Sequence, residues 1–500
     1  MNESSINLAD TITPEHLLAI GSRQSGVFVD DETIAAVDRS NNTLTTRLAS
    51  GEAVYGVTTG FGPFVDKPVD HDAQIELQMN LMQQLGCNVG PHLPSDIVRA
   101  IMAVRARALA RGISGVRSRV LNSLIDMINS GATPVIRRFG SVGASGDLVP
   151  LASLARCMAG WDTIRLPDGK VVENSPGTLA DLGIDAFSPQ PKEALSIVNG
   201  TSFSSAIAAV CTARTLRSFN EAVLPLVATA LTLLDASHQH LSSTIYEFKA
   251  HDSAKQVAEL LRRLMDIDRP AESPGLPQPP YSSRSAVLWY GAAAEKLDAA
   301  YSTLVTELNS VDDNPISVPE KELLLHGANF QGTYAALAAD DLSQAIGRIA
   351  IGLERLLNRL LHDNHNGDLP AFLADKPVGL HSGLQGCQLL ATSLTADIRS
   401  RQAAHGLSSI PTNGDNQDIV SMSANACLNA LELSDRFAQL LAVSECIFAR
   451  AVSLSAAKLP SPLAAHWDER RDLVNADFTH GDLSTLIDER HMEIWNGQPV

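Results

Sequence analysis

Residues 140–150 read Gly-Ser-Val-Gly-Ala-Ser-Gly-Asp-Leu-Val-Pro and lead directly into an apolar segment, residues 151–158. The glycines at 140, 143 and 146 permit positive φ angles and a close approach of the backbone to other groups. Asp147 is a suitable N-cap, and the leucines and alanines after it form a helical apolar face. These residues predict a tight turn at the start of a helix.

The tripeptide Ala144-Ser145-Gly146 in this turn has the residue types needed to form a reactive ring. Attack of the Gly146 amide nitrogen on the Ala144 carbonyl carbon, with loss of water, closes an imidazolone. Dehydration of Ser145 then adds a methylidene group. The attack needs a small residue at 144 and a glycine at 146. By itself the tripeptide carries little signal, because a glycine-rich turn before a helix is more often an ordinary loop or an anion-binding turn.

Composition excludes several classes of protein. With 500 residues and 45% hydrophobic content, the chain can bury a large core, ordinarily split into two or more lobes. The net charge of −18 disfavours binding to nucleic acid or to anionic membrane surfaces. We therefore expect small, soluble partners.

The cysteines and apolar segments indicate the compartment. Six cysteines are scattered without a Cys-x-x-Cys pair, which predicts neither a zinc site nor a disulfide framework and favours a reducing cytoplasm. The N-terminal residues lack the features of an export signal, and the apolar run over residues 222–234 is too short to span a bilayer. We expect no transmembrane helix.

Hydrophobic periodicity predicts mainly helices. The clearest pattern spaces apolar residues alternately by four and three, a seam that packs nearly parallel helices, at Leu342, Ile346, Ile349, Leu353, Leu356 and Leu360. Partner helices are expected over residues 202–234 (bent at Pro225), 286–308 and 424–455. Shorter elements are expected as helices after Thr13-Pro14 and over 31–49, 75–85 and 97–110, and as a hairpin around 167–170.

The tight turn and other motifs resemble one family. Residues 140–152 resemble the signature of the aromatic amino acid ammonia-lyases and aminomutases, the family of histidine and phenylalanine ammonia-lyase. Tyr-Gly-Val-Thr-Thr-Gly-Phe-Gly-Pro at 55–63 is similar to their lid loop, although its composition alone also fits a strand-to-turn connection with a packed tyrosine. Further matches follow in the same order at Ile197-Val198-Asn199-Gly200-Thr201, Asp312-Asp313-Asn314-Pro315, Gly327-Ala328-Asn329-Phe330 and 416–422.

The resemblance implies a mainly α fold, with a long central helix bundle and a smaller N-terminal lobe that carries both loops. We expect the lobe over residues 1–200 and the bundle, with the oligomerisation surfaces, over 201–500. A bundle of such helices favours a homo-oligomer, and the family implies a homotetramer with shared active sites. The implied cofactor is 4-methylidene-imidazol-5-one (MIO), formed from Ala144, Ser145 and Gly146, with no metal and no nucleotide.

The resemblance also assigns roles to side chains. Tyr55 is expected to be the catalytic base and Asn199 the active-site asparagine. Arg284 is expected to hold the substrate carboxylate beside Tyr281, a solvated surface arginine being the alternative. This chain has Gln278-Pro279 and Val287-Leu288 where many members have Gln-Asp and Pro-Gln, which puts the hold on that tyrosine and arginine in doubt. The expected substrate-binding residues are Gly62, Gln84, Leu85, Asn314, Phe330 and Gln417.

The expected reaction is elimination of ammonia from an aromatic L-α-amino acid to give the trans-arylacrylate. Histidine-specific members resemble one another in having Ser-His where this chain has Gln84-Leu85, and a glutamate at Gln417, so histidine is disfavoured. A polar Gln84 fits the phenol of tyrosine better than a bare phenyl ring, unless it faces water or a neighbouring helix. The alternatives are an aminomutase that forms a product such as β-tyrosine, histidine ammonia-lyase, and a helical scaffold without the electrophile.

Overall fold

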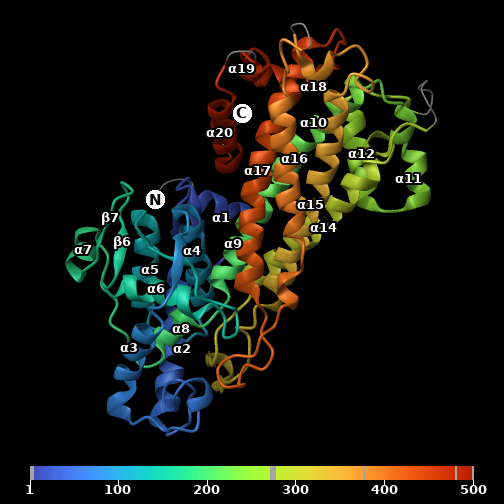
Figure 1. Cartoon of the computed structure of the whole chain (residues 1–500). Coiled ribbons are helices and arrows are strands. Elements are labelled where there is room, and N and C mark those ends of the chain that lie inside the picture. Colours follow the sequence, from blue (N-terminus) through green and yellow to red (C-terminus); the bar gives the residue numbers. More distant parts are fainter. Residues whose placement is uncertain (1–4, 271–277, 376–378, 479–480, 498–500) are drawn as a thin grey trace. The chain divides into compact units, whose positions relative to one another are not determined.

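The computed structural model describes residues 5–270, 278–375, 379–478 and 481–497. Most of this chain is helical, and its strands form small sheets of two or three (Figure 1). The mainly α-helical fold predicted from the periodicity is therefore confirmed.

The chain forms two compact units, which do not coincide with the predicted division at residue 200. The first contains residues 1–213, 300–340 and 404–429, and the second contains 214–299, 341–403 and 430–500. The chain returns twice to the first unit because long helices include residues of both. These helices are α9 (Ser202–Ser218), α14 (Ala286–Leu308), α15 (Thr333–Leu361) and α17 (Ser423–Leu454).

Short helices dominate the first unit. Three of them begin with a side-chain N-cap: Thr13 accepts from His16 N, Asp30 from Thr33 N, and Ser175 from Thr178 N. The first four lie where the sequence predicted them, whereas the fifth, the seventh and the eighth were not predicted. The helices are α1 (Pro14–Gly21), α2 (Asp31–Ala49), α3 (Gln74–Gln84), α4 (Ser95–Ala110), α5 (Ser118–Ser130), α6 (Leu148–Met158), α7 (Pro176–Asp181) and α8 (Glu193–Val198).

Helix α4 forms the centre of this unit. All its residues from Ile97 to Ala110 are buried, and it packs against α1, α2 and α5. Two of its three buried arginines are hydrogen-bonded: Arg99 Nε donates to Gly21 O at the end of α1 (2.7 Å), whereas Arg107 Nε and Nη1 have no hydrogen-bond partner among the residues that the structure describes. Arg105 reaches the candidate site described below.

The strands are short and pair in small sheets. The hairpin predicted around 167–170 is confirmed, because β6 (Thr163–Arg165) pairs antiparallel with β7 (Val171–Glu173). β4 (Thr133–Pro134) adds a third strand to that sheet. The other pairs are β1 (Ile6–Asn7) with β2 (Val27–Phe28), β3 (Val89–His92) with β5 (Arg137–Phe139), and β8 (Ile316–Val318) with β9 (Leu323–Leu325).

The second unit contains the predicted seam. The six apolar residues of α15 spaced by four and three are all fully buried. Helix α10 packs against α12 and α18 (Figure 1). The remaining helices of this unit are α10 (Leu224–Leu233), α11 (Ser243–Lys249), α12 (Asp252–Leu264), α13 (Tyr281–Arg284), α16 (Gln385–Ser400), α18 (Ser461–Glu469), α19 (Arg471–Val474) and α20 (Leu483–Asn496).

The helix predicted over 202–234 is interrupted before Pro225. A π-helical turn, Phe219–Val223, separates α9 from α10. Proline has no N–H to donate to the carbonyl four residues earlier, that of Glu221. Arg470 Nη2 donates to this carbonyl instead (3.4 Å).

Helix α17 is long and apolar, although no transmembrane helix was expected from the sequence. By length and composition it is the one helix among the described residues that could cross a membrane. However, 72% of its apolar window is buried, and the core helix of a soluble protein passes the same test. It also carries the fully buried Glu445, which forms ion pairs with Arg470 and Arg490.

Candidate active site

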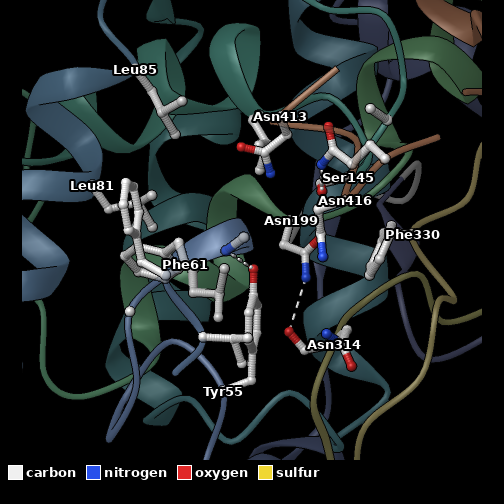
Figure 2. A pocket seen from close by; sticks show the side chains of 18 of the residues that line it. Tyr55, Phe61, Leu81, Leu85, Ser145, Asn199, Asn314, Phe330, Asn413 and Asn416 are labelled. Atoms are coloured by element: carbon white, nitrogen blue, oxygen red, sulfur yellow. Dashed lines mark hydrogen bonds between the residues drawn. The ribbon is translucent and has the colours of Figure 1, made fainter. Parts of the chain in front are cut away.

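A cavity of about 930 Å³ in the first unit brings together most of the predicted site residues. In Figure 2, Leu81 and Leu85 lie on one side of this space and Ser145 and Phe330 on the other, with Tyr55 between them. Ten of the thirteen predicted residues line it: Tyr55, Gly62, Gln84, Leu85, Ala144, Ser145, Asn199, Asn314, Phe330 and Gln417. The other three are Gly146, next to Ser145, and Tyr281 and Arg284, which belong to the second unit.

The predicted tight turn is present, and only glycine fits at its key position. Gly143 and Gly146 have φ angles of +72° and +65°, in the left-handed region. A Cβ atom on Gly146 would lie 2.3–2.5 Å from the backbone O, N and C atoms of Gly200. Asp147 N donates to Gly200 O (2.7 Å). The turn is therefore packed directly against the backbone that follows Asn199.

Asp147 begins α6, but its side chain does not cap the helix as predicted. Its carboxylate accepts hydrogen bonds from Ser204 N and Ser204 Oγ, and from Ser141 Oγ, each at 2.9 Å. The cap was wrongly predicted because these donors compete for the carboxylate. Complete burial raises the pKa of Asp147 to about 6, although the hydrogen bonds act to lower it. Asp147 thus connects the turn to α9.

Gln417 contacts the hydroxyl group that the ring-forming chemistry would remove. Its Nε2 donates to Ser145 Oγ (2.6 Å), and its Oε1 accepts from Thr412 Oγ1 (2.7 Å). Nearby, Ser421 Oγ donates to Gly143 O (2.8 Å). Residues 412–421 therefore contact the turn at two points.

Two asparagines form a pair at the cavity. Asn199 Nδ2 donates to the backbone carbonyl of Asn314 (2.9 Å), which fixes the orientation of the amide because a carbonyl cannot donate. Asn199 Oδ1 has no hydrogen-bond partner, although the residue is only 2% exposed. A buried acceptor of this kind is normally satisfied by a hydrogen-bond donor.

Two buried ion pairs support this asparagine pair. Arg105 Nη2 lies 2.6 Å from Asp312 Oδ1, and its Nη1 donates to Asn199 O (3.1 Å). Lys192 Nζ lies 2.9 Å from Asp313 Oδ2. Burial lowers the pKa of Lys192, and Asp313 opposes that shift. Neither Arg105 nor Lys192 was predicted as a site residue. The two aspartates of the Asp-Asp-Asn motif indicate that cationic partners are needed, but they do not indicate where in the chain those partners lie.

The lid loop is held at several atoms. Tyr55 Oη accepts from Gly62 N (2.9 Å), and its ring packs edge-on against Phe61, with centroids 6.2 Å apart. Tyr55 N donates to His326 Nε2 (3.1 Å). The fully buried Gln78 donates to Gly56 O (2.8 Å) and accepts from Leu195 N (3.0 Å), which joins the loop to α3 and α8.

Gln84 and Leu85, which were expected to distinguish between substrate rings, lie at the end of α3. The side chain of Gln84 is exposed and hydrogen-bonds to none of the residues that the structure describes, and Leu85 is half-buried. One turn earlier, Asn80 and Leu81 also line the cavity, which helical spacing of four residues could have predicted. Lining residues with no such signal include Asn413, Asn416 and Ile419.

Tyr281 and Arg284 contact each other within α13. The guanidinium carbon of Arg284 lies 4.7 Å from the centre of the Tyr281 ring, and Tyr281 is 71% exposed. Every residue that lines the cavity belongs to the first unit, so the roles expected for these two residues remain predictions.

The acidic, histidine and cysteine side chains are the ones that could bind a metal ion. In the ranges that the structure describes, they form no group of three or more that could hold a metal ion. None of the six cysteines forms a disulfide, and five of them are buried.

Comparison with known proteins gives a consistent family. Residues 12–472 match the family model of the aromatic amino acid lyases. The chain is 34% identical over 471 residues to the MIO-dependent tyrosine 2,3-aminomutase of Streptomyces globisporus, covering 89% of this chain and 86% of that one. A crystal structure of tyrosine aminomutase from that organism superposes with a TM-score of 0.90 and 30% identity, over 99% and 97% of the two chains.

Two other relatives are ammonia-lyases. The chain is 33% identical over 504 residues to histidine ammonia-lyase of Myxococcus xanthus, covering 96% of each chain. It is 34% identical over 467 residues to tyrosine ammonia-lyase of Cupriavidus metallidurans, covering 89% of this chain and 87% of that one. These relatives differ in substrate and product but share nearly the whole length of the chain. The protein is therefore an enzyme that belongs to the aromatic amino acid lyase family.

Proposed function

We propose that the protein eliminates ammonia from an aromatic L-α-amino acid, tyrosine in preference to phenylalanine, to give the trans-arylacrylate. The observation that carries this proposal is the shared cavity of Tyr55, the Ala144-Ser145 turn and the unpaired oxygen of Asn199. A base, a site for an electrophile and an acceptor for an amino group then face one substrate. Similarity to both lyases and aminomutases supports this class of chemistry.

The turn suits the MIO group. Ala144 is small, the Ser145 hydroxyl lies on the cavity, and Gly146 packs where a Cβ atom would collide with Gly200. Gln417 would hold the group at its Ser145 side. When formed, MIO supplies an electrophilic methylidene that draws electrons from the substrate and so helps the amino group to leave. The relative from Streptomyces globisporus that is named MIO-dependent supports this assignment.

The remaining roles follow from the cavity wall. Tyr55 Oη takes the β-proton while the carbon–nitrogen bond breaks and the double bond forms, with ammonia as the leaving group. Asn199 Oδ1 accepts a hydrogen bond from the amino group, because its Nδ2 is already bound to Asn314 O. Phe330 and Leu85 pack on the aromatic ring, and Gln84 donates to or accepts from its hydroxyl group.

The carboxylate of the substrate needs a cation. We infer that Arg284 provides it, with Tyr281 beside it, in a cytoplasmic homotetramer whose active sites are built from more than one subunit. A guanidinium can bind a carboxylate with two parallel hydrogen bonds. An aminomutase, which adds ammonia back at the β-carbon to form a product such as β-tyrosine, is the nearest alternative, and histidine ammonia-lyase follows it.

One assay distinguishes these activities. The purified protein is incubated separately with tyrosine, phenylalanine and histidine, and arylacrylates are measured by absorbance and β-amino acids by chromatography. The expected result is p-coumarate from tyrosine. A β-amino acid as the main product, or turnover of histidine alone, would replace the proposal. The intact mass should also fall by two waters, and wild-type protein of full mass that still turned over substrate would exclude MIO.

The role of Gln84 is tested by kcat/KM for tyrosine and phenylalanine. A site built to bond a hydroxyl rejects the analogue that lacks it, because its polar group is left unpaired. Gln84→Phe should therefore reduce the preference for tyrosine by about tenfold or more. Equal values in the wild type, or a preference for phenylalanine that Gln84→Phe leaves unchanged, would show that Gln84 does not bind the hydroxyl.

A further inference from the structure

His326 joins the lid loop to the asparagine pair. Its Nε2 accepts the backbone N–H of Tyr55 (3.1 Å), and the next residue, Gly327, donates its N–H to Asn314 Oδ1 (2.7 Å). Farther along the same segment, Phe330 lines the cavity. Residues 326–330 are thus tied to Asn314, and His326 connects this segment to the backbone of Tyr55.

This contact depends on the protonation of the imidazole. Nε2 can accept a hydrogen bond only in the neutral ring that carries its proton on Nδ1. The charged groups that act on the ring are Glu52, three residues before Tyr55, and Lys192, just before α8. Partial burial lowers the pKa of His326 below its ordinary value, Glu52 acts to raise it, and Lys192 acts to lower it. The ring is therefore neutral near pH 7 and able to accept.

We propose that His326 is a positioning residue for Tyr55: the neutral ring holds the backbone of Tyr55 at the cavity, and protonation of the ring releases it. A protonated ring places an N–H where Tyr55 N–H points, so the two donors repel. The proposal rests on the proposed function in one respect, which is that Tyr55 acts as the base. The backbone contact itself does not depend on that role.

Gln78 of α3 also contacts the lid loop, and it provides a matched control because its side chain does not titrate. Gln78 Nε2 donates to Gly56 O (2.8 Å), the carbonyl of the residue after Tyr55. Its amide keeps one state across the whole pH range, unlike an imidazole. Gln78→Leu therefore loosens the loop without changing any proton equilibrium, whereas His326→Gln removes the proton equilibrium but retains an acceptor.

The first measurement is amide hydrogen exchange by mass spectrometry on peptides that contain Tyr55 at pH 7.5. His326→Leu should lose protection of one amide in this region, and His326→Gln should retain it. Unchanged protection in His326→Leu would overturn the proposal. If the leucine variant does not fold, wild type is compared at pH 7.5 and at a pH below the pKa of His326, which is measured by NMR titration, after correction for intrinsic exchange. Loss of the same protection at the lower pH is then expected, and equal protection would overturn the proposal.

The second measurement is kcat with saturating substrate, from below the measured pKa of His326 up to about pH 8.5. Below the pKa of His326, wild-type kcat should fall more steeply than that of His326→Gln, by up to about tenfold for each pH unit. Gln78→Leu should have a lower kcat but the wild-type acid limb. A wild-type acid limb in His326→Gln would overturn the proposal. Lost amide protection in His326→Leu with unchanged kcat would confirm the contact and refute Tyr55 as the base.

Discussion

Tyr55→Phe tests the chemistry because it removes one hydroxyl group and leaves the packing of the ring. The ring still meets Phe61 edge-on, and the bond from Tyr55 N to His326 does not involve the hydroxyl. The hydrogen bond lost is the one that Gly62 N donates to Tyr55 Oη. A typical intramolecular hydrogen bond contributes about 0.5–1.5 kcal/mol net, so the free energy of unfolding should fall by about 1 kcal/mol.

Catalysis should suffer much more than stability. Loss of a general base typically lowers the rate by about 10² to 10⁴ fold, which is about 3–5 kcal/mol of transition-state stabilisation. This exceeds the loss from one hydrogen bond in the lid loop. The KM should change little, because the hydroxyl acts on the β-proton rather than holding the substrate.

The assay is steady-state formation of the arylacrylate, with kcat and KM measured for each variant. Tyr301→Phe is a suitable control, because Tyr301 Oη donates to Glu15 Oε2 (2.8 Å) and Tyr301 does not line the cavity. The control should keep normal kinetics. A kcat of Tyr55→Phe within about threefold of wild type would refute the assigned role, since base loss should cost at least about 10² fold.

Three further substitutions test other parts of the structure. Arg284→Lys should raise KM for the amino acid roughly tenfold with a smaller change in kcat, because an ammonium cannot replace the planar fork; an unchanged KM would remove Arg284 from the site. Asp312→Asn should lower the free energy of unfolding in urea by about 3–5 kcal/mol, since it leaves Arg105 buried without its anion; a loss below about 1 kcal/mol would be typical of an exposed pair. Burial raises the pKa of Glu307 to about 7, so the folded state binds its proton more tightly and stability falls as pH rises from about 4.5 to 7. Glu307→Gln should therefore raise the melting temperature at pH 8 by a few degrees and change it little at pH 4.5, and an equal change at both values would contradict the assignment.

Local signals in the sequence predicted some of the helices that have them, but α7 and α20, which begin with side-chain caps from Ser175 and Asp482, were missed. Helices α2 and α14 begin and end at the predicted residues, and α2 has Asp30 as a side-chain N-cap. Helices α5 and α12 were missed. Their N-cap residues, Arg117 and His251, make no side-chain cap hydrogen bond, so the usual start signal is absent.

The site could be predicted only through the resemblance, because its contacts are distant in sequence. Gln417 and Ser145 are 272 residues apart, and Asn199 and Asn314 are 115 apart. No periodicity encodes such pairs. The same reason explains why the side-chain cap at Asp147 was wrongly predicted: its carboxylate accepts hydrogen bonds from Ser204, which lies in another helix.

The contacts around the cavity divide its residues into two groups with different freedom to change. Asn199 and the tight turn are bound to the backbone of other segments, so a substitution there disturbs several elements at once. Gln84 lies at the end of α3 with no hydrogen bond to any residue that the structure describes, and Leu85 follows it. If these two positions contact the substrate ring, as we propose, changes there would alter which ring fits while the bound groups stay in place. This division is consistent with a family in which relatives of similar identity carry the names of different aromatic substrates.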